Sequence, residues 1–175
     1  MPEGVCTGMV ALVTGASKGG TGTAIARRLA AEGARVAITA RSVDGLEETR
    51  ALIEERGGEF FVVPVDLSDP TGGREELVDL VESALGPVDV LVNNADANGY
   101  VPFDEARAKD VERCFQVNLW APWILMRGVL PAMRQRGRGW IVNLTSFAAE
   151  LPPGPPFPRT RPRPLDSSTA RRRPR

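Results

Sequence analysis

The segment best suited to binding a ligand is a glycine-rich run near the amino terminus. It reads TGASKGGTG over residues 14–22 and lies between an apolar run and a segment with helical spacing. Glycines at such a turn let the backbone approach a pyrophosphate closely, and the following helix N-terminus supplies free N–H groups and a partial positive charge. A plain strand-to-helix turn would also use glycine, but the strand before it and the helix after it favour a dinucleotide site.

The residue at the end of the second apolar run indicates which dinucleotide this is. A free ribose 2′-hydroxyl is typically held there by Asp or Glu, and a 2′-phosphate by Arg. The run that begins at Val36 ends in Arg41-Ser42, with no acid at its tip. Arg41 can form charge-assisted bonds to a phosphate, although it can also be an ordinary solvated arginine. The sequence predicts NADP rather than NAD.

The residue types that are missing exclude several kinds of catalysis. The chain has no histidine, and its two cysteines, Cys6 and Cys114, form no CxxC pair. Ser-His-Asp triads, Cys-His pairs and histidine-based metal sites are therefore excluded, and we expect no metal. No apolar run approaches the ~20 residues of a membrane span, and residues 1–9 do not resemble a secretory signal. We expect a cytoplasmic protein with no membrane partner.

Five short apolar runs predict the strands that would position these residues. They are nearly continuous, as in strands buried on both faces of a parallel sheet, and they span residues 9–13, 35–39, 60–65, 88–92 and 140–144. Segments with apolar residues at helical spacing lie between them. This alternation predicts an α/β fold, a doubly wound parallel sheet of Rossmann type with five strands in the order 3-2-1-4-5.

The last intervening segment, residues 104–137, is longer than one average helix. Pro122 removes an intrahelical donor, so we expect a bend or break near Asn118. An apolar stripe runs along this segment through Val111, Phe115, Leu119, Val129 and Met133.

Composition divides the chain near residue 150. Residues 1–158 carry 15 basic and 21 acidic side chains, a net charge of −6. Residues 159–175 carry seven arginines and one acid, a net charge of +6, so the two parts cancel to zero over the whole chain. Eight of the 15 prolines lie between Pro152 and Pro174. We expect a dinucleotide-binding domain over residues 1–150 and a Pro/Arg-rich tail over residues 151–175 that is irregular or disordered.

Together, the motifs resemble the short-chain dehydrogenase/reductase family over roughly residues 10–149. Residues 14–22 resemble its TGxxxGxG loop, and residues 93–95 resemble its NNAG motif. Asp66 falls at the end of the third strand, Asn118 in the long helix, and Ser146 after the fifth strand. Singly, each has an ordinary explanation as a cap or loop residue. Such ordinary explanations do not account for five motifs that occur together in the family's order and spacing.

The resemblance implies hydride transfer between NADP(H) and a small carbonyl or alcohol substrate. It makes Ser146 and Asn118 the remaining catalytic residues, and it places Lys18 beside Arg41 on the 2′-phosphate and Asp66 at the adenine. The residues that it implies for binding the nicotinamide dinucleotide are Gly15, Ser17, Lys18, Gly20, Thr21, Gly22, Arg41, Asp66, Leu67, Asn93 and Ala95.

Two departures from the family pattern lie in the cofactor motifs. Four residues rather than three separate Gly15 from Gly20, so either Gly19 or Gly20 can take the middle position of the loop. Asp96 stands where NNAG has its glycine. A carboxylate there either alters the electrostatics near the nicotinamide or turns outward to solvent, and both interpretations remain open.

A third departure concerns proton transfer. The family has a Tyr-x-x-x-Lys motif after its serine, in which the tyrosine transfers the proton and the lysine lowers the tyrosine pKa. Here the only tyrosine, Tyr100, and the only lysines, Lys18 and Lys109, all precede Ser146, and the family's usual interval leads to Arg159. We expect an oxidoreductase domain that is inactive as written. The alternative is a non-catalytic dinucleotide-binding pseudoenzyme or regulatory module.

The arginine-rich tail allows two interpretations. Its arginines could contact phosphates, but no aromatic residue follows Phe157 to stack on bases, so a nucleic-acid partner is not indicated. Its composition also resembles a GC-rich gene read out of frame, which we favour, and the chain would then be a truncated family member. In that case the fifth strand lacks its usual neighbour, and we expect self-association through its exposed edge.

Overall fold

Five parallel strands form one sheet in the order β3-β2-β1-β4-β5, as the sequence predicts. The structure is a computed structural model that describes residues 4–17, 19–54, 58–97 and 104–146. The tail expected over residues 151–175 lies outside the described residues. The strands are β1 (Val10–Thr14), β2 (Arg35–Ala40), β3 (Phe60–Pro64), β4 (Val90–Asn93) and β5 (Trp140–Asn143).

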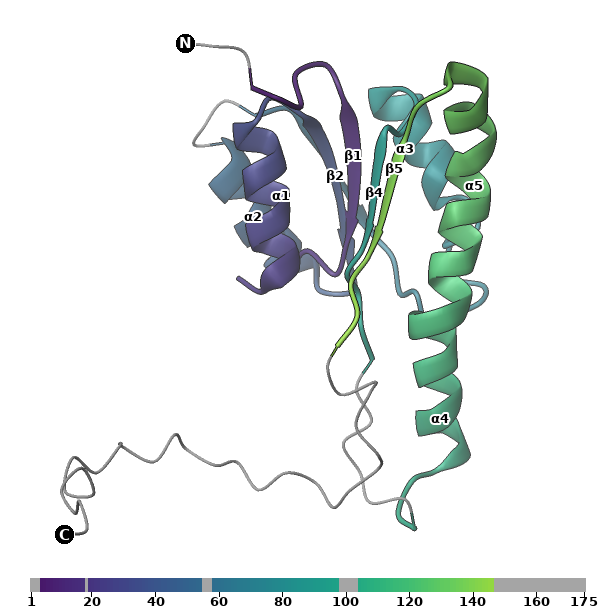
Figure 1. Cartoon of the computed structure of the whole chain (residues 1–175). Coiled ribbons are helices and arrows are strands. Elements are labelled where there is room, and N and C mark those ends of the chain that lie inside the picture. Colours follow the sequence, from purple (N-terminus) through teal and green to yellow (C-terminus); the bar gives the residue numbers. More distant parts are fainter. Residues whose placement is uncertain (1–3, 18, 55–57, 98–103, 147–175) are drawn as a thin grey trace, which may run out of the picture.

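Helices cover both faces of the sheet (Figure 1). On one face lie α1 (Thr21–Ala31) and α2 (Val43–Glu54), and on the other lie α3 (Leu77–Leu85) and α5 (Ala121–Arg136). Successive strand residues point to opposite faces, so Leu12 packs with Leu91 and Leu125 in one core cluster, whereas Val13 packs in the other. Burial on both faces explains why the strands are continuous apolar runs.

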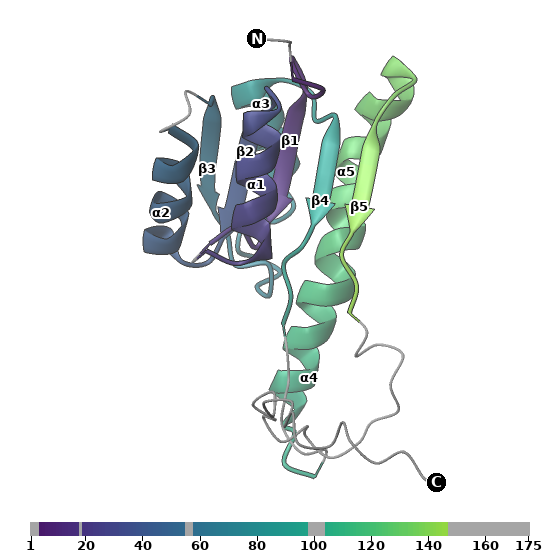
Figure 2. The ribbon, with the colours of Figure 1, turned by 60° about the vertical axis from the view of Figure 1, so that its left-hand side comes forward.

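The long helix contains a π-helical turn where the sequence predicts a bend or break. The helix α4 (Ala108–Phe115), the π-helical turn η1 (Gln116–Trp120) and α5 follow one another directly and extend beyond the sheet (Figure 2). Pro122 has no N–H to donate to the carbonyl of Asn118, and the wider turn lies where that bond is missing. The irregularity is therefore present at the predicted place, without interrupting the helix.

Only two of the five residues of the predicted apolar stripe on this long helix are buried. Val129 and Met133 are 0% and 6% exposed, because they face the sheet. Val111, Phe115 and Leu119 are about half exposed. No helix in the described ranges is long and apolar enough to span a bilayer.

The fifth strand is an edge strand in the part of the chain that the structure describes. It pairs with β4, with Val92 opposite Val142 and Asn93 opposite Asn143. Trp140 and Val142 are 48% and 46% exposed, which is unusual for apolar residues of a sheet that is otherwise well covered.

A buried carboxylate holds the amino-terminal end of this edge. Asp89 Oδ2 accepts a hydrogen bond from Val10 N at 3.1 Å, and Asp89 Oδ1 lies 3.4 Å from the Arg136 guanidinium and 3.6 Å from that of Arg138. The backbone carbonyl of Asp89 accepts from Trp140 N. One residue thereby connects β1, the end of α5 and the first residue of β5.

Candidate functional site

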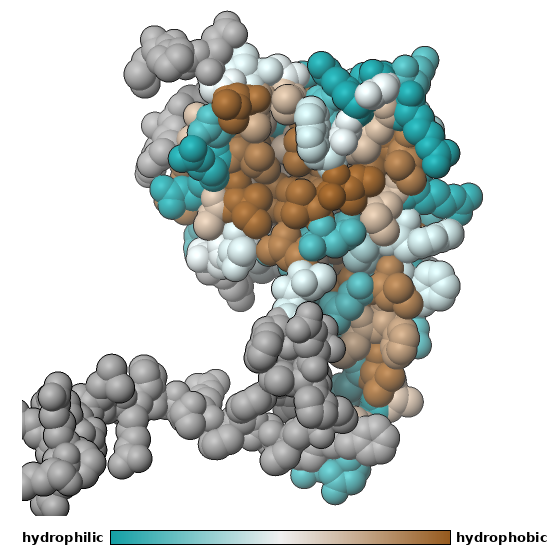
Figure 3. All heavy atoms as spheres, in the orientation of Figure 1, coloured by the Kyte–Doolittle hydropathy of each residue, from teal (hydrophilic) through white to brown (hydrophobic). Residues whose placement is uncertain are grey.

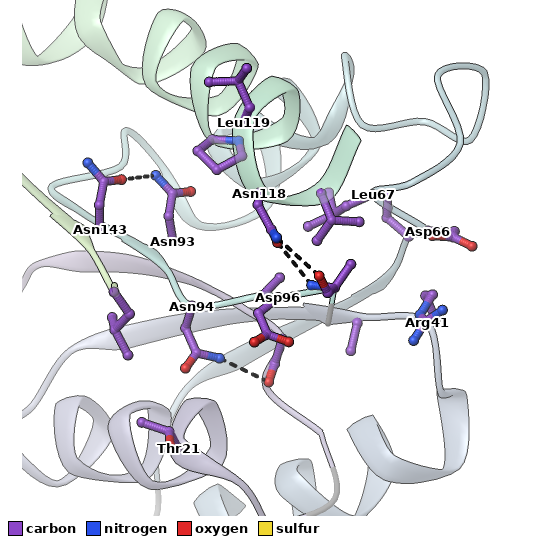
Figure 4. Close-up of a pocket in the computed structure, with 18 of the residues that line it drawn as sticks. Thr21, Arg41, Asp66, Leu67, Asn93, Asn94, Asp96, Asn118, Leu119 and Asn143 are labelled. Carbon is purple, nitrogen blue, oxygen red and sulfur yellow. Dashed lines mark hydrogen bonds between the residues drawn. The ribbon is translucent and has the colours of Figure 1, made fainter. Parts of the chain in front are cut away.

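A pocket of about 1240 Å³ opens at the carboxyl ends of the strands, where doubly wound sheets bind their ligands. The loops that follow all five strands contribute to its lining, together with η1 and the start of α5 (Figure 4). The pocket brings together ten of the predicted site residues, which are Gly15, Ser17, Thr21, Arg41, Asp66, Leu67, Asn93, Ala95, Asn118 and Ser146.

The glycine loop is fastened to the segment after β4. Thr14 Oγ1 accepts hydrogen bonds from Asn94 N and Ala95 N, both at 3.0 Å, and Asn94 Nδ2 donates to Thr14 O at 2.8 Å. A Cβ on Gly15 would lie 2.7 Å from Ala95 Cα, and Gly15 has a φ of +67°. This position therefore requires glycine for both close approach and backbone conformation.

The beginning of α1 faces the pocket with Thr21. A Cβ on Gly22 would lie 2.5 Å from Gly15 O, whereas one on Gly20 would meet only Ser17 O, at 3.8 Å. Gly20 is the N-cap of α1 and makes no side-chain cap bond, and Gly19 has a φ of +68°. Gly20 and Gly22 support the loop without lining the pocket, and Lys18 lies outside the described residues.

Arg41, Asp66 and Leu67 line the end of the pocket that follows β2 and β3. The Asp66 carboxylate accepts bonds from Ser68 N at 2.9 Å and Ser68 Oγ at 2.7 Å, so this side chain shapes its own turn. Buried Arg74 donates to Leu67 O at 3.1 Å and holds the loop in place. In the described part of the chain, no carboxylate forms an ion pair with Arg41, which leaves its guanidinium available to an anion.

Asn118 projects from η1 towards the segment that follows β4. Its Oδ1 accepts from Ala97 N at 2.9 Å and its Nδ2 donates to Ala97 O at 3.1 Å. Both polar ends of the side-chain amide therefore bond to the backbone of one residue, Ala97. The sequence singles out Asn118 but does not predict this contact. Ser146 lies at the far end of the pocket lining, after β5.

Asp96 lines the pocket and is exposed. It lies between Ala95, whose N–H bonds to Thr14, and Ala97, which Asn118 holds (Figure 4). No hydrogen-bond or ion-pair partner of its carboxylate is found in the ranges described. Asp96 therefore lines the pocket and is also open to solvent, so both interpretations of its carboxylate stay predictions.

Sequence reasoning missed several lining residues. Trp123 and Met126 follow Asn118 in the long helix, and their place on its pocket side could have been found from helical spacing. Asn143 accepts a hydrogen bond from Asn93 Nδ2 at 2.8 Å across the β4–β5 pair. Arg113 has no sequence signal of its own, since it is one exposed arginine among many.

The comparisons with known proteins agree with this geometry. The short chain dehydrogenase family model matches residues 9–155. The ketoacyl reductase HetN of Nostoc sp. is 38% identical over 144 residues, covering 82% of this chain and 50% of that protein. A fatty acyl-CoA reductase of Acinetobacter baylyi is 39% identical over 142 residues, covering 80% and 48%. The chain spans about half the length of these curated relatives.

Solved structures are similar over the same region. A metagenomic short-chain oxidoreductase in complex with NADP has a TM-score of 0.80 and 39% identity, covering 86% of this chain and 68% of the other. The L-sorbose reductase of Gluconobacter frateurii, complexed with NADPH and L-sorbose, has a TM-score of 0.76 and 38% identity, covering 85% and 56%.

Proposed function

The chain belongs to the short-chain dehydrogenase family, and from that premise we propose that it binds NADP(H) as the cofactor domain of a carbonyl or alcohol oxidoreductase. The observation that carries the proposal is the pocket itself. It runs along the sheet edge from Arg41, past Thr21 at the start of α1, to Asn118 and Ser146. The similar metagenomic oxidoreductase and the L-sorbose reductase, solved in complex with NADP and NADPH, support this cofactor. The cytoplasmic location expected from the sequence stays a prediction.

The residues present fit the dinucleotide. The turn around Gly15 and Gly22 packs so closely that a Cβ at either would overlap with protein backbone, which leaves the backbone itself to face an anion. Arg41 would hold the 2′-phosphate, and Asp66 and Leu67 line the end of the pocket where the adenine would lie. When bound, the nicotinamide gives or takes the hydride.

The substrate side of the site has one polarising group, and the described residues that line the pocket include no tyrosine or lysine to transfer a proton. The Ser146 hydroxyl would bond to a substrate oxygen, while Asn118 keeps the backbone at Ala97 in place. No tyrosine or lysine follows Ser146 in the sequence. We therefore propose binding of the cofactor without turnover by these 175 residues. The second candidate is a dinucleotide-binding regulatory module, favoured by the same missing pair.

The cofactor proposal predicts that NADPH binds more tightly than NADH. The contact between Arg41 and the 2′-phosphate is a charge-assisted hydrogen bond worth roughly 1.5–3 kcal/mol, about tenfold or more in affinity. In Arg41→Asp the preference should reverse or disappear, because the new carboxylate repels the phosphate and can accept from the 2′-hydroxyl. Fluorescence titration of both nucleotides measures it. The control is Arg134→Asp, the same change on the exposed end of α5. Equal affinities of the wild type for NADPH and NADH would contradict the assignment.

The edge strand predicts self-association of this chain through a second copy. Within the described residues, the outer backbone groups of β5 beside exposed Trp140 and Val142 pair with no strand and form a template for another β5. Figure 3 shows apolar residues gathered over this side of the sheet and down the long helix. Val142→Lys should weaken association about tenfold by placing a charge on the edge. Sedimentation equilibrium measures the change, with Val5→Lys as the control at a distant exposed site. A wild-type chain that stays monomeric at high concentration would contradict self-association through β5.

A further inference from the structure

Asp96 presents a carboxylate from a stretch of backbone that is held at a fixed place in the wall of the pocket. The backbone before it is tied to Thr14 through Ala95 N, and the backbone after it is tied to Asn118 through Ala97 N and O. Hydrogen bonds on both sides fix the Cα of Asp96 relative to the glycine loop and to η1. Its side chain has no partner in the described residues, so its charge is not neutralised by the protein.

The strand order determines which part of a dinucleotide passes Asp96. Arg41 follows β2, the glycine loop follows β1, Asp96 follows β4 and Ser146 follows β5, and these strands lie side by side in the order β2-β1-β4-β5. A ligand with its 2′-phosphate at Arg41 and its pyrophosphate at the glycine loop must continue across the end of β4. The redox-active half therefore passes Asp96 on its way towards Ser146.

We infer that the Asp96 carboxylate makes this site bind oxidised NADP⁺ in preference to reduced NADPH, an inference that rests on the proposed cofactor. The oxidised ring carries one positive charge that the reduced ring lacks, and the two ligands are otherwise nearly the same. An unpaired carboxylate that a fixed backbone presents near the ring attracts the first and not the second. Asp96 is in this sense a specificity-determining residue for the oxidation state of the ligand.

A ratio of affinities isolates this effect from every other charge in the pocket. Asp96 also repels the pyrophosphate, but it does so in both ligands, so that contribution cancels when the dissociation constant of NADPH is divided by that of NADP⁺. Arg41, Asp66 and Arg113, the other charged groups in the pocket wall, are unchanged by substitution of Asp96 and cancel in the same way.

The experiment is calorimetric titration of the 175-residue chain with NADP⁺ and with NADPH, in the wild type, Asp96→Asn and Asp96→Gly. Both variants remove the charge, so we expect the ratio to fall about three- to tenfold in each, and the effect to shrink at high salt. The control is Asp79→Asn, which removes the same charge from an exposed position on α3 and should leave the ratio unchanged.

The outcomes separate this inference from the cofactor proposal. If the wild type binds both nucleotides and the ratio is the same in all variants, the inference is wrong and the cofactor proposal stands. If Asp96→Asn tightens both nucleotides equally, the carboxylate lies near the pyrophosphate rather than the ring, which also overturns the inference. If the wild type binds neither nucleotide, the proposed function and the inference both fall.

Discussion

The purified 175-residue chain should not oxidise NADPH above background with any aldehyde or ketone, nor reduce NADP⁺ with any alcohol. Ser146 can polarise a substrate oxygen, but neither a tyrosine nor a lysine follows it in the sequence to pass the proton as the family's pair does. General acid–base catalysis contributes typically ~10²–10⁴-fold, and a tyrosine at the reference pKa of about 10 is a poor substitute at neutral pH when no lysine lowers that pKa. Absorbance at the reduced nicotinamide band measures the rate.

Supplying the missing pair should restore the activity. A chimera that keeps this chain through Phe157 and continues with the second half of a similar solved oxidoreductase provides a tyrosine and a lysine beside Ser146. We expect its rate to exceed that of the parent chain by about 10²–10⁴-fold, and Ser146→Ala in the chimera to abolish most of the gain. NADPH oxidation by the parent chain that disappears in Ser146→Ala would show that the pair is not needed. A folded chimera that binds NADPH without turnover would favour the regulatory module.

Replacement of Gly22 by alanine should abolish dinucleotide binding. The added Cβ would lie 2.5 Å from Gly15 O and 2.6 Å from Asn94 Nδ2. Neither atom can move away without breaking the hydrogen bonds of Asn94 Nδ2 to the carbonyls of Thr14 and Gly15. We expect a loss of at least about 100-fold in affinity, and a loss of roughly 1–3 kcal/mol in the free energy of unfolding, as for other overpacked sites. Titration with NADPH and thermal denaturation measure the two effects.

Gly20→Ala is the matched control for Gly22→Ala. A Cβ at Gly20 has only Ser17 O within 4 Å, and the backbone there has a φ of −78°, which any residue can adopt. The protein should therefore keep its stability. If Gly20→Ala destabilised the fold as much as Gly22→Ala, the steric explanation would be wrong.

The sheet could be predicted from the sequence because its strands obey one simple rule. A strand buried on both faces must be apolar at nearly every position, and β1, β2 and β4 follow this pattern almost without exception. The strand order and the glycine turn then place Gly15, Arg41 and Ser146 at one edge. The contacts between segments could not be predicted from the pattern of the sequence. The clamp of Asn118 on Ala97 joins positions that are 21 residues apart.

The long helix shows where the same reasoning reaches its limit. Helical spacing predicts a stripe that includes Val111 and Phe115 as readily as Val129, yet the sheet reaches only the later part of the helix. Spacing states which residues share a face, and not what lies opposite that face. Pro122 likewise predicts an irregular turn, but not that the chain widens by a π-helical turn and continues.

Because β5 pairs with fewer strands than β1 does in the described structure, the two ends of the pocket should differ in how readily they open. β1, which carries the glycine loop, is paired on both sides, whereas β5, which leads to Ser146, has β4 as its one partner in the described structure. Asp89 secures the first residue of β5, whereas in the described structure the carboxyl end of the strand is held to β4 by Leu144 N to Asn93 O and by Asn93 Nδ2 to Asn143 Oδ1, so separation from β4 should begin there. Such partial opening costs less free energy than global unfolding. The end of the pocket at Arg41 should persist as a rigid half-site through fluctuations that repeatedly take the Ser146 end apart.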